Sequence, residues 1–191
     1  MTDEQFAKIQ LIEGLVKPSE GKRLNELASQ VTEGVIVEIG SYKGLSTCYL
    51  AIDAKVPVYA IDVWDSGIFY DPVRAARFNV LETFAAFCDN IKALGVKVEI
   101  LKGRSSEIAK IWTQPIGMLF IDGCHSYRGC KADFVDYSPH IIPGGFIAFH
   151  DYNEDGGRFP GIKQFVDELK QTMDWHDWKL TRRLMTTQRA T

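Results

Sequence analysis

The stretch Val35-Ile36-Val37-Glu38-Ile39-Gly40-Ser41-Tyr42-Lys43-Gly44-Leu45-Ser46 decides the fold of this chain. It begins as a short apolar run with β-branched residues, which is typical of a strand buried on both faces. Gly40 and Gly44 follow, and an amphipathic segment then runs from Leu45 to Ala54. Because glycine serves where φ becomes positive or where another group approaches the backbone, the stretch predicts a strand that turns sharply into a helix.

The same turn predicts a pocket for a small polar ligand. The start of the helix offers unpaired N–H groups and the positive end of the helix dipole, and Glu38 supplies an acceptor at the floor. The glycine spacing differs from the G-x-G-x-x-G pattern that binds a dinucleotide pyrophosphate, and no Gly-Lys-Ser/Thr sequence completes a P-loop. An NAD-linked dehydrogenase is therefore disfavoured.

The composition is that of an ordinary globular protein. The chain has 191 residues, 46% of them apolar and 25% charged, with a formal net charge of −3. That length predicts a single domain over 1–191, with a helical cover at 1–33 and a core at 34–191. We expect a cytoplasmic protein that binds neither nucleic acid nor membrane, because the charge is not basic and no apolar run has transmembrane length. The four cysteines form no C-x-x-C pair, which favours a reducing compartment.

Strand and helix patterns alternate five times along the chain, which implies a parallel sheet with right-handed crossovers. Two helices are expected first, one over 3–16 that Pro18 ends and a second that Ser19 caps. A turn at Pro143-Gly144-Gly145 precedes the fifth strand, and a β-hairpin closes the chain over 175–190. The predicted strands are 35–39, 56–62, 96–101, 116–122 and 146–151, and the predicted helices between and after them are 45–54, 72–94, 105–111, 127–137 and 162–173.

Asp62 ends the second predicted strand, 22 residues beyond Gly40. An acidic residue at about that distance can accept both ribose hydroxyls of an adenosine ligand. This chemistry serves NAD and S-adenosylmethionine equally, so Asp62 predicts a nucleoside ligand without choosing between them. A turn or helix-cap aspartate is the alternative interpretation.

The fourth predicted strand ends in Asp122, and the fifth ends in His150 followed by Asp151. Ligands of open α/β sheets bind beyond the carboxyl ends of the strands, and buried carboxylates there need a partner. A cation is the simplest partner for Asp122 and Asp151, and oxygen ligands suit Mg²⁺. His150 is a candidate third ligand, and its nitrogen would move the preference toward Mn²⁺, Fe²⁺ or Zn²⁺.

Several motifs in order resemble those of class I S-adenosylmethionine-dependent methyltransferases, in particular the small O-methyltransferases that modify sugars and antibiotics. They are the E-x-G-x-x-x-G-x-S turn at Glu38, I-D-G-x-H-x-Y at 121–127, P-G-G-x-I-A-x-H-D-Y at 143–152 and P-G-I-K-Q-F-V at 160–166. The resemblance implies a Rossmann-like, doubly wound α/β fold with a mostly parallel, seven-stranded sheet and N-terminal helices. It implies S-adenosyl-L-methionine as cofactor, held by Glu38, Gly40, Ser41, Tyr42, Gly44, Ser46, Asp62, Val63, Gly103, Ser105 and Asp122. Ser105 is placed beside the adenine by this resemblance, although it could equally cap a helix.

In metal-dependent members of this family, acidic residues at Asp122 and Asp151 hold Mg²⁺, and a histidine at His125 is the general base. Some relatives have an acid where this chain has His150, so the third ligand is open. A sugar hydroxyl has a pKa far above neutrality, so its methylation needs a base, a Lewis acid or both. We therefore predict divalent-metal-assisted O-methylation of a sugar or natural-product hydroxyl. A hydroxylase on the same scaffold and a non-catalytic cofactor-binding module are the alternatives, and a homodimer is one candidate assembly.

Overall fold

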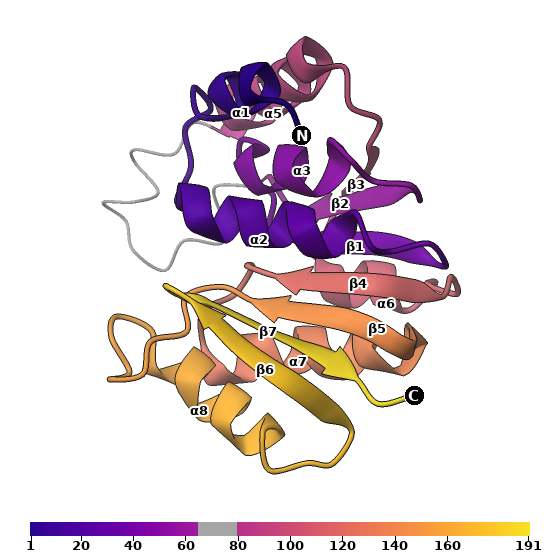
Figure 1. Cartoon of the computed structure of the whole chain (residues 1–191), viewed down its shortest axis with the longest axis vertical. Helices are drawn as coiled ribbons and strands as arrows, with labels where there is room; N and C mark the ends of the chain where they lie inside the picture. The colour runs from indigo at the N-terminus through magenta and orange to yellow at the C-terminus, as the bar shows by residue number, and fades with distance from the viewer. Residues whose placement is uncertain (65–79) are drawn as a thin grey trace.

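The computed structural model describes residues 1–64 and 80–191. Within these ranges, seven strands form one sheet in the order β3-β2-β1-β4-β5-β7-β6 (Figure 1). β1 to β5 run parallel, whereas β7 is antiparallel to both β5 and β6. This mostly parallel seven-stranded sheet confirms the predicted Rossmann-like fold. The strands are β1 (Val35–Ile39), β2 (Val58–Asp62), β3 (Glu99–Lys102), β4 (Ile116–Ile121), β5 (Ile141–Phe149), β6 (Trp175–Thr181) and β7 (Leu184–Arg189).

The two central strands are apolar except for Glu38, because both faces of the sheet are covered there. Every residue of β1 and β4 is buried. One covering layer contains α1 (Asp3–Ile9), α2 (Pro18–Ala28), α3 (Leu45–Ala51) and α5 (Val80–Leu94), and the other contains α6 (Ser105–Ala109), α7 (Tyr127–Tyr137) and α8 (Pro160–Leu169). In Figure 1, α2 lies in front of the sheet and α8 lies behind β6 and β7.

The N-terminal helices differ from the prediction. α1 ends at Ile9 instead of reaching residue 16, and Pro18 begins α2 instead of ending the helix before it. Proline suits the first helical position because the N–H that it lacks would have no partner inside the helix. Lys17, not Ser19, is therefore the N-cap residue. The backbone N–H of Lys17 donates a hydrogen bond to the Glu20 side chain.

The fifth strand is longer than predicted, because the Pro143-Gly144-Gly145 segment lies inside it. β5 begins at Ile141, which pairs with Ile116, and its register against β4 shifts before Phe146 pairs with Met118. The supposed turn is thus an irregularity within the strand. The predicted terminal hairpin is confirmed as β6 and β7.

The other strand and helix boundaries lie within a few residues of the predicted ones. The predicted loop at 65–71 and the first part of the predicted helix at 72–94 lie outside the described residues. In the ranges that are described, no helix is both long enough and apolar enough to cross a bilayer.

Candidate functional site

The glycine-rich turn after β1 has the geometry that its sequence predicted. Gly40 and Gly44 have φ values of 93° and 87°, and Gly44 caps the start of α3. A Cβ atom on Gly40 would collide with the backbone carbonyl of Asp122. The turns after β1 and β4 therefore touch, and glycine is required at position 40 both for its φ and for this close approach.

Asp62 closes the same turn from the tip of β2. Its Oδ2 atom accepts hydrogen bonds from the backbone N–H groups of Ser41 and Tyr42, both at 2.9 Å. The N–H of Gly103 in turn donates to the Asp62 backbone carbonyl at 2.9 Å, which places the turn after β3 beside the tip of β2. Val63 follows Asp62 directly and is half-buried. The tips of β1, β2 and β3 thus lie next to one another, as predicted.

Glu38 lies beneath this turn and is completely buried. Its Oε2 atom accepts hydrogen bonds from the hydroxyls of Ser41, at 2.7 Å, and Thr47. Its Oε1 atom is one of the buried side-chain atoms that have no hydrogen-bond partner among the described residues. Burial raises the pKa of Glu38 to about 7, and the nearby Asp122 carboxylate adds to this effect. Ser46 is buried in the first turn of α3, and its hydroxyl, like those of Thr47 and Ser41, opposes the rise in the pKa of Glu38.

Asp122, His125 and Asp151 form a cluster at the tips of β4 and β5. His125 Nε2 lies 3.4 Å from Asp122 Oδ1 and 3.0 Å from Asp151 Oδ2. One ligand atom from each of the three residues lies within 4.8 Å of the others, an arrangement that could hold a metal ion. Burial disfavours the charged imidazole, but the two carboxylates outweigh it and raise the pKa of His125 to about 9. In the absence of a metal, His125 is therefore protonated at neutral pH.

His150, which the sequence suggested as third metal ligand, lies deeper than His125. Its side chain is 1% exposed, with Nδ1 3.1 Å from Asp122 Oδ1 and 3.8 Å from Asp151 Oδ1. Burial opposes its charge, yet the Asp122 carboxylate and its other acidic neighbours raise the pKa of His150 to about 10. Asp122 is correspondingly held at a pKa of about 2, because His150 and His125 outweigh the effect of its burial. His125 Nε2 thus lies within 3.4 Å of both carboxylates, whereas His150 Nδ1 is that close only to Asp122, and the role of His150 as a ligand stays a prediction.

Two residues of this cluster were missed by the sequence analysis. Glu20 of α2 is fully buried, and its carboxylate lies 3.4 Å from His150 Nε2 and accepts the backbone N–H of Arg183 at 2.9 Å. Arg183 lies in the turn between β6 and β7, and its guanidinium donates to Asp151 Oδ1 at 2.5 Å. A glutamate in the first turn of a helix and an arginine in a hairpin turn are common on protein surfaces, so no local pattern marks either residue.

The cluster has an aromatic wall on its outer side. The Phe159 ring stacks on the His125 ring, with centroids 4.4 Å apart and planes 23° apart. The Arg158 guanidinium carbon lies 5.4 Å from the centre of the Phe159 ring. Phe159 thus restricts the His125 ring and separates it from solvent on that side.

Ser105 begins α6 directly after the turn that follows β3. Its hydroxyl donates to Asp133 Oδ1 at 2.6 Å, and it is not the N-cap residue, which is Arg104. The alternative interpretation of Ser105 as a helix cap is therefore wrong. Asp133, on α7, was not singled out from the sequence.

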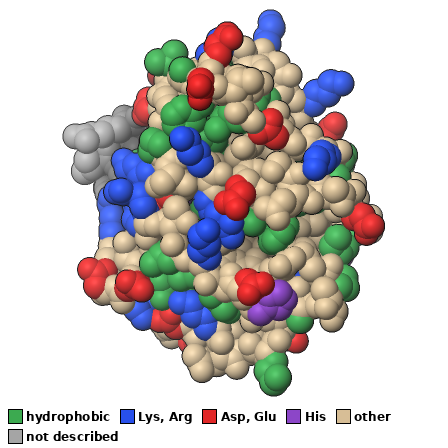
Figure 2. All heavy atoms as spheres, viewed as in Figure 1, with side chains coloured by type: hydrophobic (Ala, Val, Ile, Leu, Met, Phe, Trp, Pro, Cys, Tyr) green, Lys and Arg blue, Asp and Glu red, His purple; other side chains and the backbone are tan. Residues whose placement is uncertain are grey.

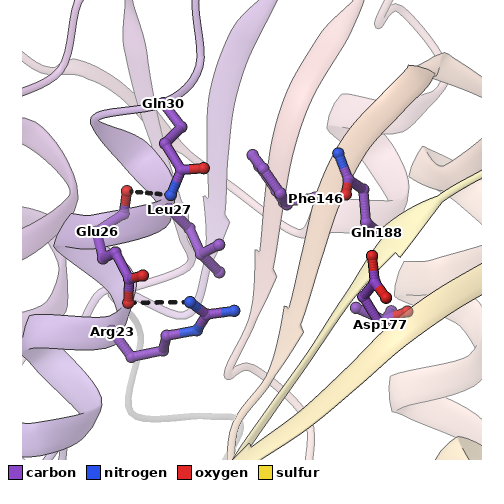
Figure 3. Close-up of a pocket in the computed structure, with 8 residues that line it drawn as sticks. Arg23, Glu26, Leu27, Gln30, Phe146, Asp177 and Gln188 are labelled. Atoms are coloured by element: carbon purple, nitrogen blue, oxygen red, sulfur yellow. Dashed lines mark hydrogen bonds and ion pairs between the residues drawn. The ribbon is translucent and has the colours of Figure 1, made fainter.

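A small hollow lies on the sheet face beside α2, away from this cluster (Figure 3). It has a volume of about 200 Å³ and is bordered by α2 on one side and by β5 and β7 on the other. Its lining residues are Arg23, Glu26, Leu27, Gln30, Phe146, Asp177, Thr187 and Gln188. On the face that Figure 2 shows, hydrophobic side chains are scattered among charged side chains of both signs.

Comparisons with known proteins agree with this geometry. The model of a family described as a methyltransferase domain matches residues 37–152, which is more than half of the chain. The uncharacterized protein y4gI of Sinorhizobium fredii is 24% identical in an alignment of 143 residues that covers 70% of this chain and 15% of that protein. The chain thus matches only a small part of that curated relative's length.

Solved structures share the fold at low sequence identity. An O-methyltransferase from Bacillus cereus, in complex with SAH, has a TM-score of 0.71 at 17% identity, over 100% of this chain and 92% of that chain. The O-methyltransferase TomG from Streptomyces achromogenes, in complex with SAM, has a TM-score of 0.70 at 19% identity, over 100% and 91% of the two chains. The SAH-bound methyltransferase PaMTH1 from Podospora anserina has a TM-score of 0.69 at 16% identity, over 100% and 89%.

Proposed function

This chain belongs to the methyltransferase family, and we propose that it is an S-adenosylmethionine-dependent O-methyltransferase acting on a small-molecule hydroxyl with the help of a divalent cation. The acceptor class proposed is a sugar or natural-product hydroxyl. The B. cereus and S. achromogenes structures are O-methyltransferases with SAH or SAM bound, which supports the cofactor and the reaction type proposed for this chain.

The observation that carries the proposal is the pocket formed by Glu38, Asp62 and the turn between them. A buried carboxylate oxygen without a partner is costly, so Glu38 Oε1 is suited to a ligand that donates hydrogen bonds, such as the ammonium group of the cofactor. Asp62 accepts the backbone N–H groups of Ser41 and Tyr42 through Oδ2 and that of Trp64 through Oδ1, and a carboxylate has about four acceptor sites, so Oδ1 keeps acceptor capacity for a ribose hydroxyl. The residues present therefore fit S-adenosylmethionine, which when bound supplies an electrophilic methyl group.

His125 is the proposed base for the acceptor hydroxyl. In its neutral form the imidazole can accept the hydroxyl proton, and the Asp122 and Asp151 carboxylates then stabilise the imidazolium that results. Phe159 holds the ring in place by stacking on it. This is the division of roles expected when a hydroxyl must lose its proton as its oxygen attacks a methyl carbon.

A divalent cation fits the donor set of Asp122, His125 and Asp151, because two carboxylates and one imidazole suit Mn²⁺, Fe²⁺ or Zn²⁺ as well as Mg²⁺. When bound, the cation would lower the pKa of the acceptor hydroxyl and fix its direction. A bound cation would also favour the neutral form of His125, whether His125 acts as ligand or as base. The ligand set predicted from the sequence has His150 in place of His125, and the Mn²⁺ titration described below distinguishes the two sets.

Calorimetric titration with S-adenosylhomocysteine tests the cofactor assignment. We expect micromolar binding that falls at least about tenfold in Asp62→Asn, because the amide has only one acceptor oxygen for the ribose and the turn. Asp89→Asn, on the exposed face of α5, is the matched control and should bind as the wild type does. No binding by the wild type would defeat the cofactor assignment.

Titration with Mn²⁺, followed by electron paramagnetic resonance, tests the metal site separately. Asp122→Asn and Asp151→Asn should both weaken binding, and the comparison of His125→Ala with His150→Ala identifies the nitrogen ligand. Full methyl transfer in the presence of a chelator would remove the metal from the proposal. The product mass then separates methylation, which adds a methylene, from hydroxylation, which adds an oxygen.

A further inference from the structure

We propose that Asp133 is a positioning residue that fixes the proton of the Ser105 hydroxyl and so makes the nucleobase end of the cofactor site selective for an adenine amino group. The inference rests on the proposed cofactor and names what selects its base. It follows from three observations: the hydrogen bond between the two side chains, the burial of Asp133, and the place of the pair beside the tip of β2.

The two side chains form a fixed pair between α6 and α7. The Ser105 hydroxyl donates to Asp133 Oδ1 at 2.6 Å, and Asp133 is 6% exposed. The Tyr137 hydroxyl donates to the Ser105 backbone carbonyl at 2.9 Å, which holds the residue from the other side. Burial raises the pKa of Asp133 to about 6, so the group is still mostly ionised at pH 7.5. An ionised carboxylate only accepts hydrogen bonds, which fixes the direction of the bond to Ser105.

This direction decides what Ser105 can offer to a ligand. A hydroxyl has one proton and two lone pairs, and the proton of Ser105 is committed to Asp133. Only its lone pairs remain, so Ser105 can accept from an amino group but cannot donate to a carbonyl oxygen. Adenine presents an amino group at its sixth position, whereas hypoxanthine presents a carbonyl oxygen there. The pair therefore distinguishes these two bases by hydrogen-bond direction alone.

The order of the strand tips places the pair where the base of the cofactor is expected. Glu38 lies at the tip of β1 and Asp62 at the tip of β2, and the next strand toward the sheet edge is β3. The N–H of Gly103, in the turn that leads from β3 to Ser105, contacts the Asp62 carbonyl. On the opposite side, a Cβ atom added to Gly123 would lie 3.5 Å from Asp133 Oδ2, so the turn after β4 also borders the pair. A ligand that extends from Glu38 past Asp62 therefore next meets these turns.

A purely structural role, in which Asp133 only ties α6 to α7, makes a different prediction. Loss of a tie would weaken all cofactor analogues alike, whereas loss of the fixed proton changes the preference between two bases. The ratio of two dissociation constants is therefore the informative quantity, since a general loss of stability cancels in it.

The experiment compares S-adenosylhomocysteine with S-inosylhomocysteine by isothermal titration calorimetry at pH 7.5. The wild type should bind the adenine compound at least about tenfold more tightly. This difference in affinity is expected because, with hypoxanthine, the hydrogen bond to Ser105 is lost and the hydroxyl oxygen faces a carbonyl oxygen, which is also an acceptor. Asp133→Asn should reduce this ratio at least about fivefold, because an amide can donate to Ser105 and release its proton. Ser105→Ala should reduce the ratio in the same way, and Ser105→Thr, which keeps the hydroxyl, should preserve it.

Asp136→Asn, on the same helix as Asp133, is the matched control and should leave the ratio unchanged. An unchanged ratio in folded Asp133→Asn, or in Ser105→Ala, would overturn the inference while leaving the proposed function intact. Wild-type protein that binds neither compound would defeat the proposed function and this inference with it. Thermal unfolding of each variant shows whether it is folded, and Ser105→Ala supplies the answer if Asp133→Asn does not fold.

Discussion

Glu20 and His150 lie 130 positions apart in the chain, and their Oε2 and Nε2 atoms are 3.4 Å apart in the interior. Both side chains are shielded from solvent, with exposures of 0% and 1%. Neighbouring acids raise the pKa of His150 to about 10, so it is charged at neutral pH and its two ring nitrogens face Glu20 and Asp122. The helical cover at the N-terminus thereby contributes a charge to the site at the strand tips.

Glu20→Gln should destabilise the fold by roughly 3–5 kcal/mol, the range found when one partner of a buried ion pair is removed. Urea unfolding measures this change. Glu26→Gln on the same helix is the control, because Glu26 is exposed, pairs with Arg23 at the surface and should contribute less than about 1 kcal/mol. Equal effects of the two substitutions would contradict the assignment of a buried charge to Glu20.

His125→Ala should lower the rate of methyl transfer by about 10²–10⁴-fold, the usual contribution of a general base, while S-adenosylhomocysteine binding changes little. His176→Ala is the control, because His176 is exposed and contacts Asp177. A variant at position 125 with normal turnover would remove the base assignment.

The dependence of the rate on pH should follow the state of the same imidazole. A base acts in its neutral form, so without a metal the rate should rise with pH up to about 9, the raised pKa of His125. With a divalent cation bound, the rise should occur at lower pH, because the cation opposes protonation. A profile that is the same with and without a chelator would mean that no metal lies beside His125.

Gly40→Ala should destabilise the protein more than Gly95→Ala does. Both glycines have positive φ values, 93° and 66°, so alanine at either position costs about 1–3 kcal/mol of backbone strain. Only at position 40 does the added methyl group also meet another chain segment, the Asp122 carbonyl, whereas nothing lies within 4 Å at position 95. The difference between the two unfolding free energies therefore measures the contact between the turns after β1 and β4.

Glu38 should make the free energy of unfolding fall as pH rises from 4.5 to 7. Its pKa is raised from 4.5 to about 7 in the folded protein, so the folded state holds this proton more tightly than the unfolded state. Stability from this group is full below pH 4.5, falls across that window by roughly 3 kcal/mol and is level above it. Glu38→Gln should remove this slope in thermal unfolding at several pH values; a slope that survives the substitution would assign it to another group.

The strand tips could be predicted from the sequence because each is marked locally. An acid lies within two residues of the end of a strand at Glu38, Asp62, Asp122 and Asp151, and parallel strands bring their carboxyl ends to one edge. The contributions of Glu20 and Arg183 could not be predicted in this way, since they reach the site through contacts between distant segments. Pro143 misled the analysis for a related reason: it is tolerated in β5 because the register against β4 is irregular there, which only the pairing of the two strands determines.

The site joins segments that lie far apart in the sequence, with Glu20 in α2 and Arg183 in the turn between β6 and β7. During synthesis, the parallel strands can form before the ribosome has made the final hairpin. Asp151 then has no guanidinium beside it, and the backbone N–H that Glu20 accepts does not yet exist. A nascent chain should therefore gain its sheet before its complete charge network, and should become competent for turnover only when translation has passed Arg183.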